Sequence, residues 1–176
     1  MDALIQRKYF IGKSIPGVWS SVYEYKPQSS EIRATHGQIF AAICLKGPKE
    51  FSLPTAGNML LDRFHEVYFE NKHDKTLIAM EKALLESGKY LQKILENDTA
   101  ADIGIDLNLI SMVINKDILY VSSLGKGKLY AYRDGDLTDI SEALRDPTGE
   151  GLVREASLVA KKGDVYLLGT PELDQE

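Results

Sequence analysis

Three short apolar segments end in residues that could line a reaction site. They are residues 39–47, 119–128 and 165–171. Each segment runs apolar before it breaks into small or polar residues, which is typical of a buried strand and the loop after it. A divalent metal bound at such strand ends would need oxygen ligands, mostly carboxylates. The corresponding positions hold Cys44, Lys126 and Pro171. These residue types argue against a metal centre there.

The segment 125–128 reads Gly-Lys-Gly-Lys and is similar to half of a phosphate-cradling loop. Such loops depend on a helix N-terminus directly after the glycines. Here the residues that follow predict a strand. We therefore interpret the segment as a hairpin turn, with an anion contact through Lys126 as the alternative.

Composition limits the classes of function. The chain has 176 residues, of which 44% are hydrophobic and 27% are charged, as expected for one globular domain spanning 1–176. A net charge of -5 gives no attraction to nucleic acid or to an anionic membrane. Cys44 is the single cysteine, so no intrachain disulfide can form. There is no signal-peptide pattern and no apolar stretch of membrane-spanning length. We expect a soluble, cytoplasmic protein.

The period of the apolar residues changes twice along the chain. Strand patterns fill the N-terminal third, two helical stripes fill the middle, and strand patterns return in the last third. The expected strands are 4–11, 18–25, 38–44, 106–114, 118–124, 128–133, 137–140 and a final one within 165–171, and the expected helices are 55–70 and 74–96. Thr55 and Asp74 are the predicted N-caps of the helices. Residues 115–117 predict one hairpin, and Asp134 and Gly135 predict another.

This order predicts an α+β fold, because consecutive antiparallel strands need only hairpins between them. Two long helices can cover one face of one sheet, but a second sheet needs cover as well. The predicted architecture is an antiparallel β-sandwich with helices packed on the outside.

Three phrases in this order resemble motifs of the metal-dependent protein phosphatases of the PPM family, the 2C type. Residues 40–47 occupy the place of the family phrase F-A-V-F-D-G-H-G-G, and two helices follow as in the family. Residues 119–135 are similar to L-Y-V-A-N-V-G-D-S-R-A-Y-L-x-R-D-G, which is the most specific match. Residues 163–173 are similar to G-D-x-L-L-L-x-S-D-G-L. The resemblance covers nearly the whole chain.

The resemblance implies a four-layer α-β-β-α sandwich. The family continues past its third phrase into a further helix and a closing strand that carries another metal-binding aspartate. This sequence ends at Glu176, so we expect those last elements to be missing from it. Either the chain continues beyond Glu176 or the fold is a reduced version.

The departures from the family phrases bear on function. In active members, aspartates of the first and third phrases bind two metals, and the glycine after the first contributes a carbonyl. Here the matching positions are Cys44, Pro171 and Leu45, and Lys126 replaces the aspartate of the second phrase. The family also has an acidic residue and a phosphate-binding arginine near its N-terminus. The candidates for those two are Glu24 or Glu31, and Arg33.

We therefore predict a catalytically inactive phosphatase-like domain, a pseudophosphatase without a metal cofactor. It would act by binding a protein, such as a kinase or a phosphoprotein. One alternative is a divergent protein serine/threonine phosphatase whose Mg²⁺ or Mn²⁺ is held by relocated acids such as Asp102, Asp106 and Glu172. Another is a regulatory domain in which an anion binds the vacated site near Lys46 and Lys126.

Overall fold

A computed structural model describes residues 15–70, 74–96, 104–146, 149 and 151–171 of the chain. Its strands form two antiparallel sheets. The first has the order β1-β2-β3-β4-β7 and the second the order β6-β5-β8. The strands of the larger sheet are β1 (Val18–Tyr25), β2 (Gln38–Lys46), β3 (Asp106–Asn115), β4 (Ile118–Leu124) and β7 (Val153–Val159). Those of the smaller sheet are β5 (Lys128–Arg133), β6 (Asp136–Asp139) and β8 (Val165–Gly169).

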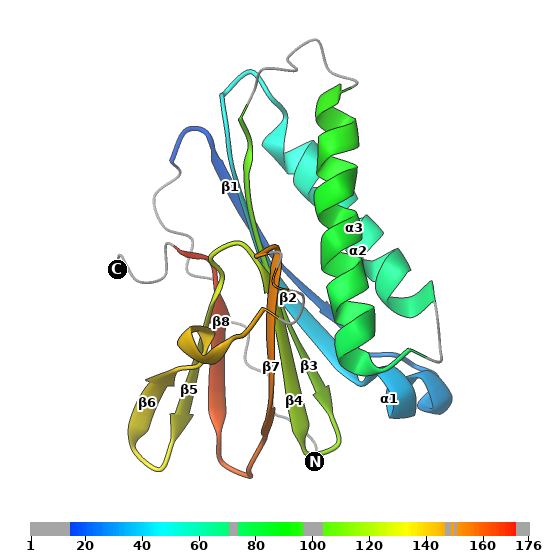
Figure 1. Cartoon of the computed structure of the whole chain (residues 1–176), viewed down its shortest axis with the longest axis vertical. Coiled ribbons are helices and arrows are strands. Elements are labelled where there is room, and N and C mark those ends of the chain that lie inside the picture. Colours follow the sequence, from blue (N-terminus) through cyan, green and yellow to red (C-terminus); the bar gives the residue numbers. More distant parts are fainter. Residues whose placement is uncertain (1–14, 71–73, 97–103, 147–148, 150, 172–176) are drawn as a thin grey trace.

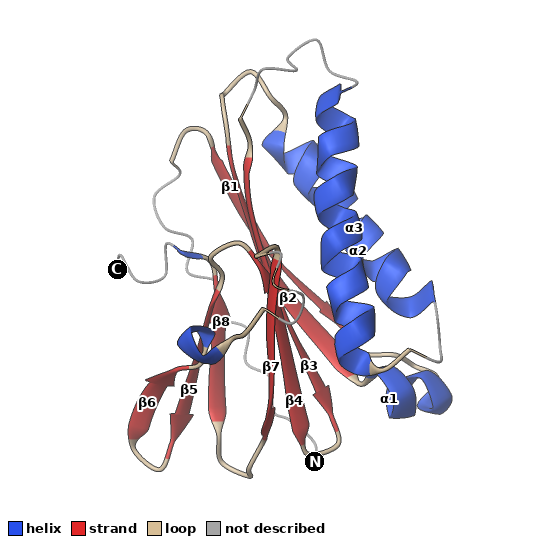
Figure 2. Cartoon of the chain, in the orientation of Figure 1, coloured by secondary structure: helices blue, strands red, loops and turns tan. Residues whose placement is uncertain are grey.

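The helices of the described residues cover one face of the larger sheet (Figure 1). They are α1 (Ser30–His36), α2 (Leu53–Glu70) and α3 (Thr76–Glu96), and a short 3₁₀ turn, η1 (Ser141–Ala143), lies beside the smaller sheet. The β-sandwich and the α+β class are thus confirmed. Of the four expected layers, the described residues form three, with α-helices on the larger sheet and only the short turn η1 beside the smaller one (Figure 2). No helix of this part of the chain is long and apolar enough to cross a membrane.

Strand β2 is apolar without alternation because both of its faces are buried. Ile39, Ala41 and Ile43 belong to the core between the larger sheet and the helices. Ala42 belongs to the second core, which lies between the two sheets. A strand between two cores cannot expose a polar side, and the unbroken apolar run of the sequence follows from this position.

The two predicted hairpins form, and each turn contains a residue with a left-handed backbone conformation. Lys116 has a φ of 57° between β3 and β4, and Asp134 has a φ of 54° between β5 and β6, followed by Gly135 at 98°. Aspartate followed by glycine favours this left-handed geometry. The sequence-based prediction of these turns is confirmed.

Two helix caps were predicted wrongly. Helix α2 begins at Leu53, so Thr55 lies inside its first turn, where the hydroxyl is 2.8 Å from that of Ser52. Helix α3 begins at Thr76, and Asp74 precedes it by two residues. Asp74 Oδ2 lies 2.7 Å from Lys82 Nζ instead. Each helix starts two residues away from its expected first residue.

Two elements were not predicted at all. Helix α1 has seven residues, and Ser29 caps it by accepting a hydrogen bond from the Ile32 amide. Strand β7 pairs with β4 along the edge of the larger sheet. The predicted strand at 4–11 lies outside the described residues.

Candidate functional site

The C-terminal ends of β2, β4 and β8 meet at one end of the sandwich. Cys44 on β2 pairs with Asn108 on β3 in the antiparallel register. Asn108 Oδ1 accepts a hydrogen bond of 2.7 Å from the Lys126 amide, just past the end of β4. Lys128 pairs with Gly169, the last residue of β8. The three segments with which the sequence analysis began therefore end in the same region.

The position of the first family aspartate is a core position here. Cys44 and Leu45 expose none of their surface. Leu45 packs into the core under the helices, and Cys44, the next residue along the strand, faces the other side of the sheet. A buried thiol is a soft ligand, whereas Mg²⁺ and Mn²⁺ prefer hard oxygen ligands. The Cys44 side chain therefore does not fit the metal pair that the family resemblance implies.

Lys126 lies in the turn between β4 and β5, with its side chain exposed. The turn is held from two sides, because Asn108 accepts from the Lys126 amide and Arg154 Nη2 donates to the Gly125 carbonyl at 2.9 Å. Gly125 has a φ of 84°, and a Cβ there would lie 2.6 Å from Asn108 Oδ1. Lys126 in the turn and Arg154 of β7 beside it are both cationic, and they disfavour a bound divalent cation by like-charge repulsion.

A shallow hollow of about 440 Å³ lies at the same end of the larger sheet. It is lined by Lys46, Gly47, Gly104, Ile105 and Asp106. Lys46 and Asp106 are register partners on β2 and β3. Lys126 does not line this hollow, so the two lysines proposed to contact an anion lie in neighbouring positions and not in one pocket. The role of either lysine as an anion contact stays a prediction.

The divergent-phosphatase hypothesis needs relocated acids at this site, and the structure places only one of the three candidates. Asp106 lies at this end of the sheet, whereas Asp102 and Glu172 fall outside the described residues. In the part of the chain that the structure describes, no group of three or more His, Cys, Asp and Glu side chains could hold a metal ion.

The candidate N-terminal residues do not reach this site. Glu24 lies opposite Phe40, four residues before Cys44 on β2, which is about 13 Å along a strand. Its carboxylate accepts a hydrogen bond of 3.1 Å from Gln38 Nε2. Arg33 on α1 donates to the Pro27 carbonyl at 2.9 Å and 3.1 Å, and Glu31 lies in the first turn of the same helix. All of these occupy the opposite end of β2.

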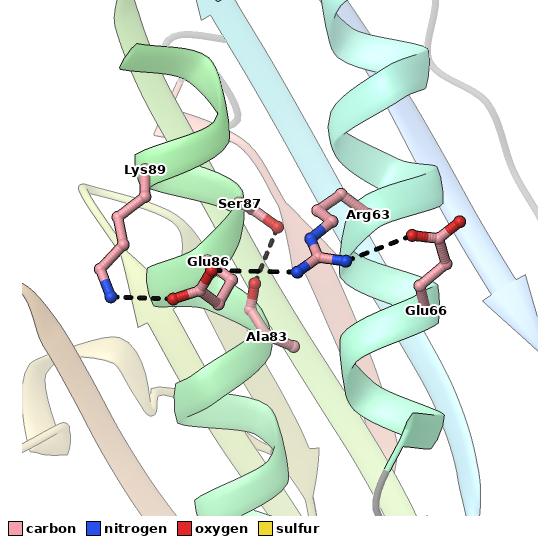
Figure 3. Close-up of polar contacts among 6 residues, drawn as sticks. All are labelled: Arg63, Glu66, Ala83, Glu86, Ser87 and Lys89. Atoms are coloured by element: carbon pink, nitrogen blue, oxygen red, sulfur yellow. Dashed lines mark hydrogen bonds and ion pairs between the residues drawn. The ribbon is translucent and has the colours of Figure 1, made fainter. Parts of the chain in front are cut away.

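A second hollow, of about 350 Å³, lies on the outer surface between α2 and α3. Several charged groups in and beside it form ion pairs (Figure 3). Arg63 lies 3.4 Å from Glu66 and 3.9 Å from Glu86, and Glu86 lies 2.8 Å from Lys89. The hydrogen bond from Lys89 lowers the pKa of the Glu86 carboxyl. These exposed ion pairs link the two helices weakly, because solvent screens them.

Sequence reasoning missed Asn108 and Arg154, which shape the β4–β5 turn. Asn108 could have been noticed, because it is a polar residue within an otherwise apolar strand segment and is 7% exposed in the fold. Buried amides are usually hydrogen-bonded. Arg154 could not have been recognised from the sequence, because strand β7, which carries it, was not predicted.

Comparison with solved structures shows the fold. The catalytic domain of the serine/threonine protein phosphatase PstP, determined with two manganese ions, matches with a TM-score of 0.57 and 16% identity over 86% of this chain and 76% of that chain. PppA, described as a key regulatory component of the T6SS in Pseudomonas aeruginosa, matches with a TM-score of 0.54 and 14% identity over 86% and 75%. A C. elegans sex determining protein matches with a TM-score of 0.57 and 12% identity over 93% of this chain and 54% of that chain.

No family model matches the sequence, and no curated protein matches it. At these identities the structural matches establish a PP2C-like fold, as the sequence motifs implied. The chain spans about three quarters of the first two proteins and about half of the third.

Proposed function

We propose that this domain is a pseudophosphatase, a PP2C-like domain that binds a protein partner without hydrolysing phosphate. The observation that carries the proposal is the chemistry of the three strand ends. Cys44 is a fully buried thiol, and Lys126 is an exposed cation whose turn is fixed by Asn108. Pro171 follows β8 and has no side-chain oxygen.

The energetic reason is the charge of a binuclear metal site. Two divalent ions bring four positive charges together, and several carboxylates must offset them before the ions can share and activate a water. Lys126 and Arg154 add positive charge at this end of the sheet. Asp106 supplies one carboxylate, opposite Lys46. This balance favours a domain that keeps the fold and does not hold the two ions.

The proposed partner is a protein, namely a kinase or a phosphoprotein in the cytoplasm. The support is the likeness of the fold to that of PstP, whose name describes a serine/threonine protein phosphatase. A recognition surface for a phosphorylated protein can persist without the chemistry, because binding and catalysis depend on different groups of the same site.

The test is metal content and turnover measured on the same purified protein. After incubation with Mn²⁺ or Mg²⁺ and gel filtration, we expect less than one metal ion for every chain and no metal-dependent hydrolysis of a phosphothreonine peptide. Two bound ions together with turnover that Asp106→Asn abolishes would establish the divergent phosphatase instead. Glu96→Gln, an exposed change at the end of α3, is the matched control.

An anion-sensing domain is the second candidate, and the hollow lined by Lys46 favours it. A ligand that binds only the folded state raises the melting temperature. If phosphate or a nucleotide binds at this hollow, the stabilisation will be saturable and will be lost in Lys46→Gln. A shift that persists in that variant would place the anion elsewhere.

A further inference from the structure

We propose that His65 on α2 and Tyr23 on β1 form a pH-sensitive latch, which holds the helix on the larger sheet and opens when the His65 ring takes up a proton. The latch lies between a helix and the sheet face that it covers, and it involves none of the strand ends of the candidate site. The inference is therefore independent of the proposed pseudophosphatase function.

The latch is a hydrogen bond between side chains that are 42 residues apart in the sequence, since the Tyr23 hydroxyl contacts His65 Nδ1. Burial is the main cause that raises the pKa of Tyr23, so the hydroxyl keeps its proton. A neutral imidazole has one nitrogen that accepts and one that donates. We therefore assign the tautomer in which Nδ1 accepts from Tyr23 and Nε2 carries the hydrogen. In this state the bond joins α2 to β1.

Three aromatic rings pack against the His65 ring. The ring centroids of Tyr25, Phe69 and Tyr23 lie 4.7 Å, 4.9 Å and 5.9 Å from that of His65. Tyr25 and Tyr23 belong to β1, and Phe69 lies one turn further along α2. These rings exclude water from one side of a half-buried side chain. Such an environment favours the neutral imidazole over the charged form.

The charges near His65 oppose this effect without cancelling it. Asp62 and Glu66 favour the protonated ring, but burial is the largest influence, and it lowers the pKa of His65 below its ordinary value. The titratable groups around the ring are Tyr23 and Tyr25 of β1, Asp62 and Glu66 of α2, and His36 of α1, which contacts the same Phe69 ring. The neutral state of His65 is thus the one that the fold favours.

A protonated His65 cannot keep the hydrogen bond in its present direction. Both nitrogens of an imidazolium donate, so Nδ1 no longer accepts from the Tyr23 hydroxyl. The hydroxyl is partly buried, and among the described residues it has no second acceptor. A donor that is removed from water and left without a partner costs free energy. Protonation therefore favours a state in which this part of α2 has moved away from β1.

The consequence for the sheet follows from the position of β1. Within the described sheet, β1 is an outermost strand, with β2 along one edge and α2 on one face. Trp19 lies against Gly57 nearer the start of α2, so the helix and the strand also touch at a second, apolar place. Helix α3 lies on β3 and β4 instead. Opening of the latch should therefore loosen β1 and leave α3 in place.

The experiment is amide hydrogen exchange of the full 176-residue chain, followed by NMR at pH 7.5 and pH 5 and corrected for the intrinsic exchange rates. Protection of the β1 amides that bond to β2 should fall at the lower pH. We expect a loss of up to about tenfold for each pH unit between 6.5 and the folded pKa of His65, because only the open state then binds the proton. The α3 amides are the internal reference and should stay protected.

Two variants test the two sides of the latch. His65→Gln cannot take up the proton, and its side-chain oxygen can still accept from Tyr23, so the pH dependence of β1 exchange should disappear. Tyr23→Phe removes the donor to the neutral ring, so the pKa of His65, measured by NMR, should rise toward its ordinary value. Tyr25→Phe is the matched control, because it keeps the ring contact with His65 and removes only a hydroxyl.

Two results would overturn the proposal. One is a wild-type His65 ring that titrates at or above pH 6.5, since the fold would then not favour the neutral form. The other is β1 exchange in His65→Gln that keeps the pH dependence of the wild-type, since another group would then be responsible. Equal loss of protection in β1 and α3 would also contradict it, because the change would be global unfolding and not release of α2 from β1.

Discussion

Glu155 on strand β7 is the residue where burial and charge conflict most clearly. Its Oε2 atom is buried and accepts no hydrogen bond from a described residue, and the same is true of the hydroxyl of Ser122, its register partner on β4. Burial raises the pKa of the Glu155 carboxyl, and the nearby Glu81 of α3 raises it further. The folded state therefore holds a proton on Glu155 at a pH where the unfolded chain has released it.

The first prediction is that Glu155→Gln stabilises the protein at neutral pH. Between the unfolded pKa of about 4.3 and the raised folded pKa, the wild-type loses free energy of unfolding as pH rises, because the folded state binds more protons. The neutral amide removes this loss, so we expect a gain of about 1 kcal/mol at pH 8. Urea unfolding of the variant and the wild-type at pH 8 and at pH 4.5 measures this gain.

At pH 4.5 the gain should largely disappear, because the wild-type carboxyl is then protonated. Glu142→Gln, an exposed change in η1, serves as the control and should show no such pH dependence. If Glu155→Gln changes the free energy of unfolding equally at pH 8 and pH 4.5, the ionisation of the Glu155 carboxyl is not the source of the stabilisation.

At the scale of the elements, the second prediction contrasts two glycines on the helices that cover the larger sheet. A Cβ at Gly57 on α2 would lie 1.8 Å from the ring of Trp19, so the helix can approach β1 only without a side chain there. A Cβ at Gly88 on α3 would lie 3.3 Å from the end of the flexible Leu124 side chain. Alanine gains about 1 kcal/mol of helix propensity over glycine at either site.

Gly57→Ala should therefore destabilise the protein by about 1–3 kcal/mol, since the rigid indole has to move. Gly88→Ala should be neutral or stabilising by up to about 1 kcal/mol, since Leu124 can shift a few tenths of an ångström. Chemical denaturation of the two variants measures the contrast. Similar destabilisation by both would mean that α3 packs as closely on β4 as α2 packs on β1.

The elements that the sequence predicted are those with strong internal periodicity. The stripes of α2 and α3 and the turn at Asp134 need no knowledge of the rest of the chain. Helix α1 has no such stripe, and its contacts come from distant residues. The Tyr68 hydroxyl donates to the His36 carbonyl at 2.6 Å, and Asn115 donates to the Thr35 carbonyl at 3.0 Å.

Strand β7 was hidden for a different reason. Arg154, Glu155 and Ser157 interrupt the apolar residues of β7, so the strand lacks a clear apolar pattern. It is the last strand of the larger sheet, and its outer edge is paired only by the short bridge between Glu155 and Arg145. For the candidate site, the apolar runs of β2, β4 and β8 were enough to predict which strand ends form it. The sequence could not show that Glu24 and Arg33 lie at the far end of β2, because that depends on the register between β1 and β2.

At the scale of the whole molecule, the two sheets are joined by a polar cluster at the end opposite to the candidate site. Arg133 on β5 donates to the Asp164 carboxylate through Nε at 2.8 Å and Nη2 at 2.5 Å, and Nη2 also donates to the Val159 carbonyl on β7 at 2.9 Å. Asp164 further accepts from the Tyr166 hydroxyl and the Lys161 amide. The Asp164 side chain is 3% exposed. The cluster therefore fixes the turn that leads from one sheet into the other.

The third prediction is that Asp164→Ala loosens this connection. The hydrogen bond from Arg133 is the main cause that lowers the pKa of the Asp164 carboxyl. Its stabilisation is therefore present above the unfolded pKa of about 3.9 and is lost as pH falls below it. We expect a loss of about 1–2 kcal/mol at pH 7, because Arg133 is partly exposed and solvent screens the pair. Urea unfolding at pH 7 and pH 3 should show this loss at pH 7 and a smaller loss at pH 3.

Asp117→Ala, in the exposed β3–β4 turn, is the control for Asp164→Ala. If Asp164→Ala costs no more than this control at pH 7, the two sheets are held together by their shared apolar core alone.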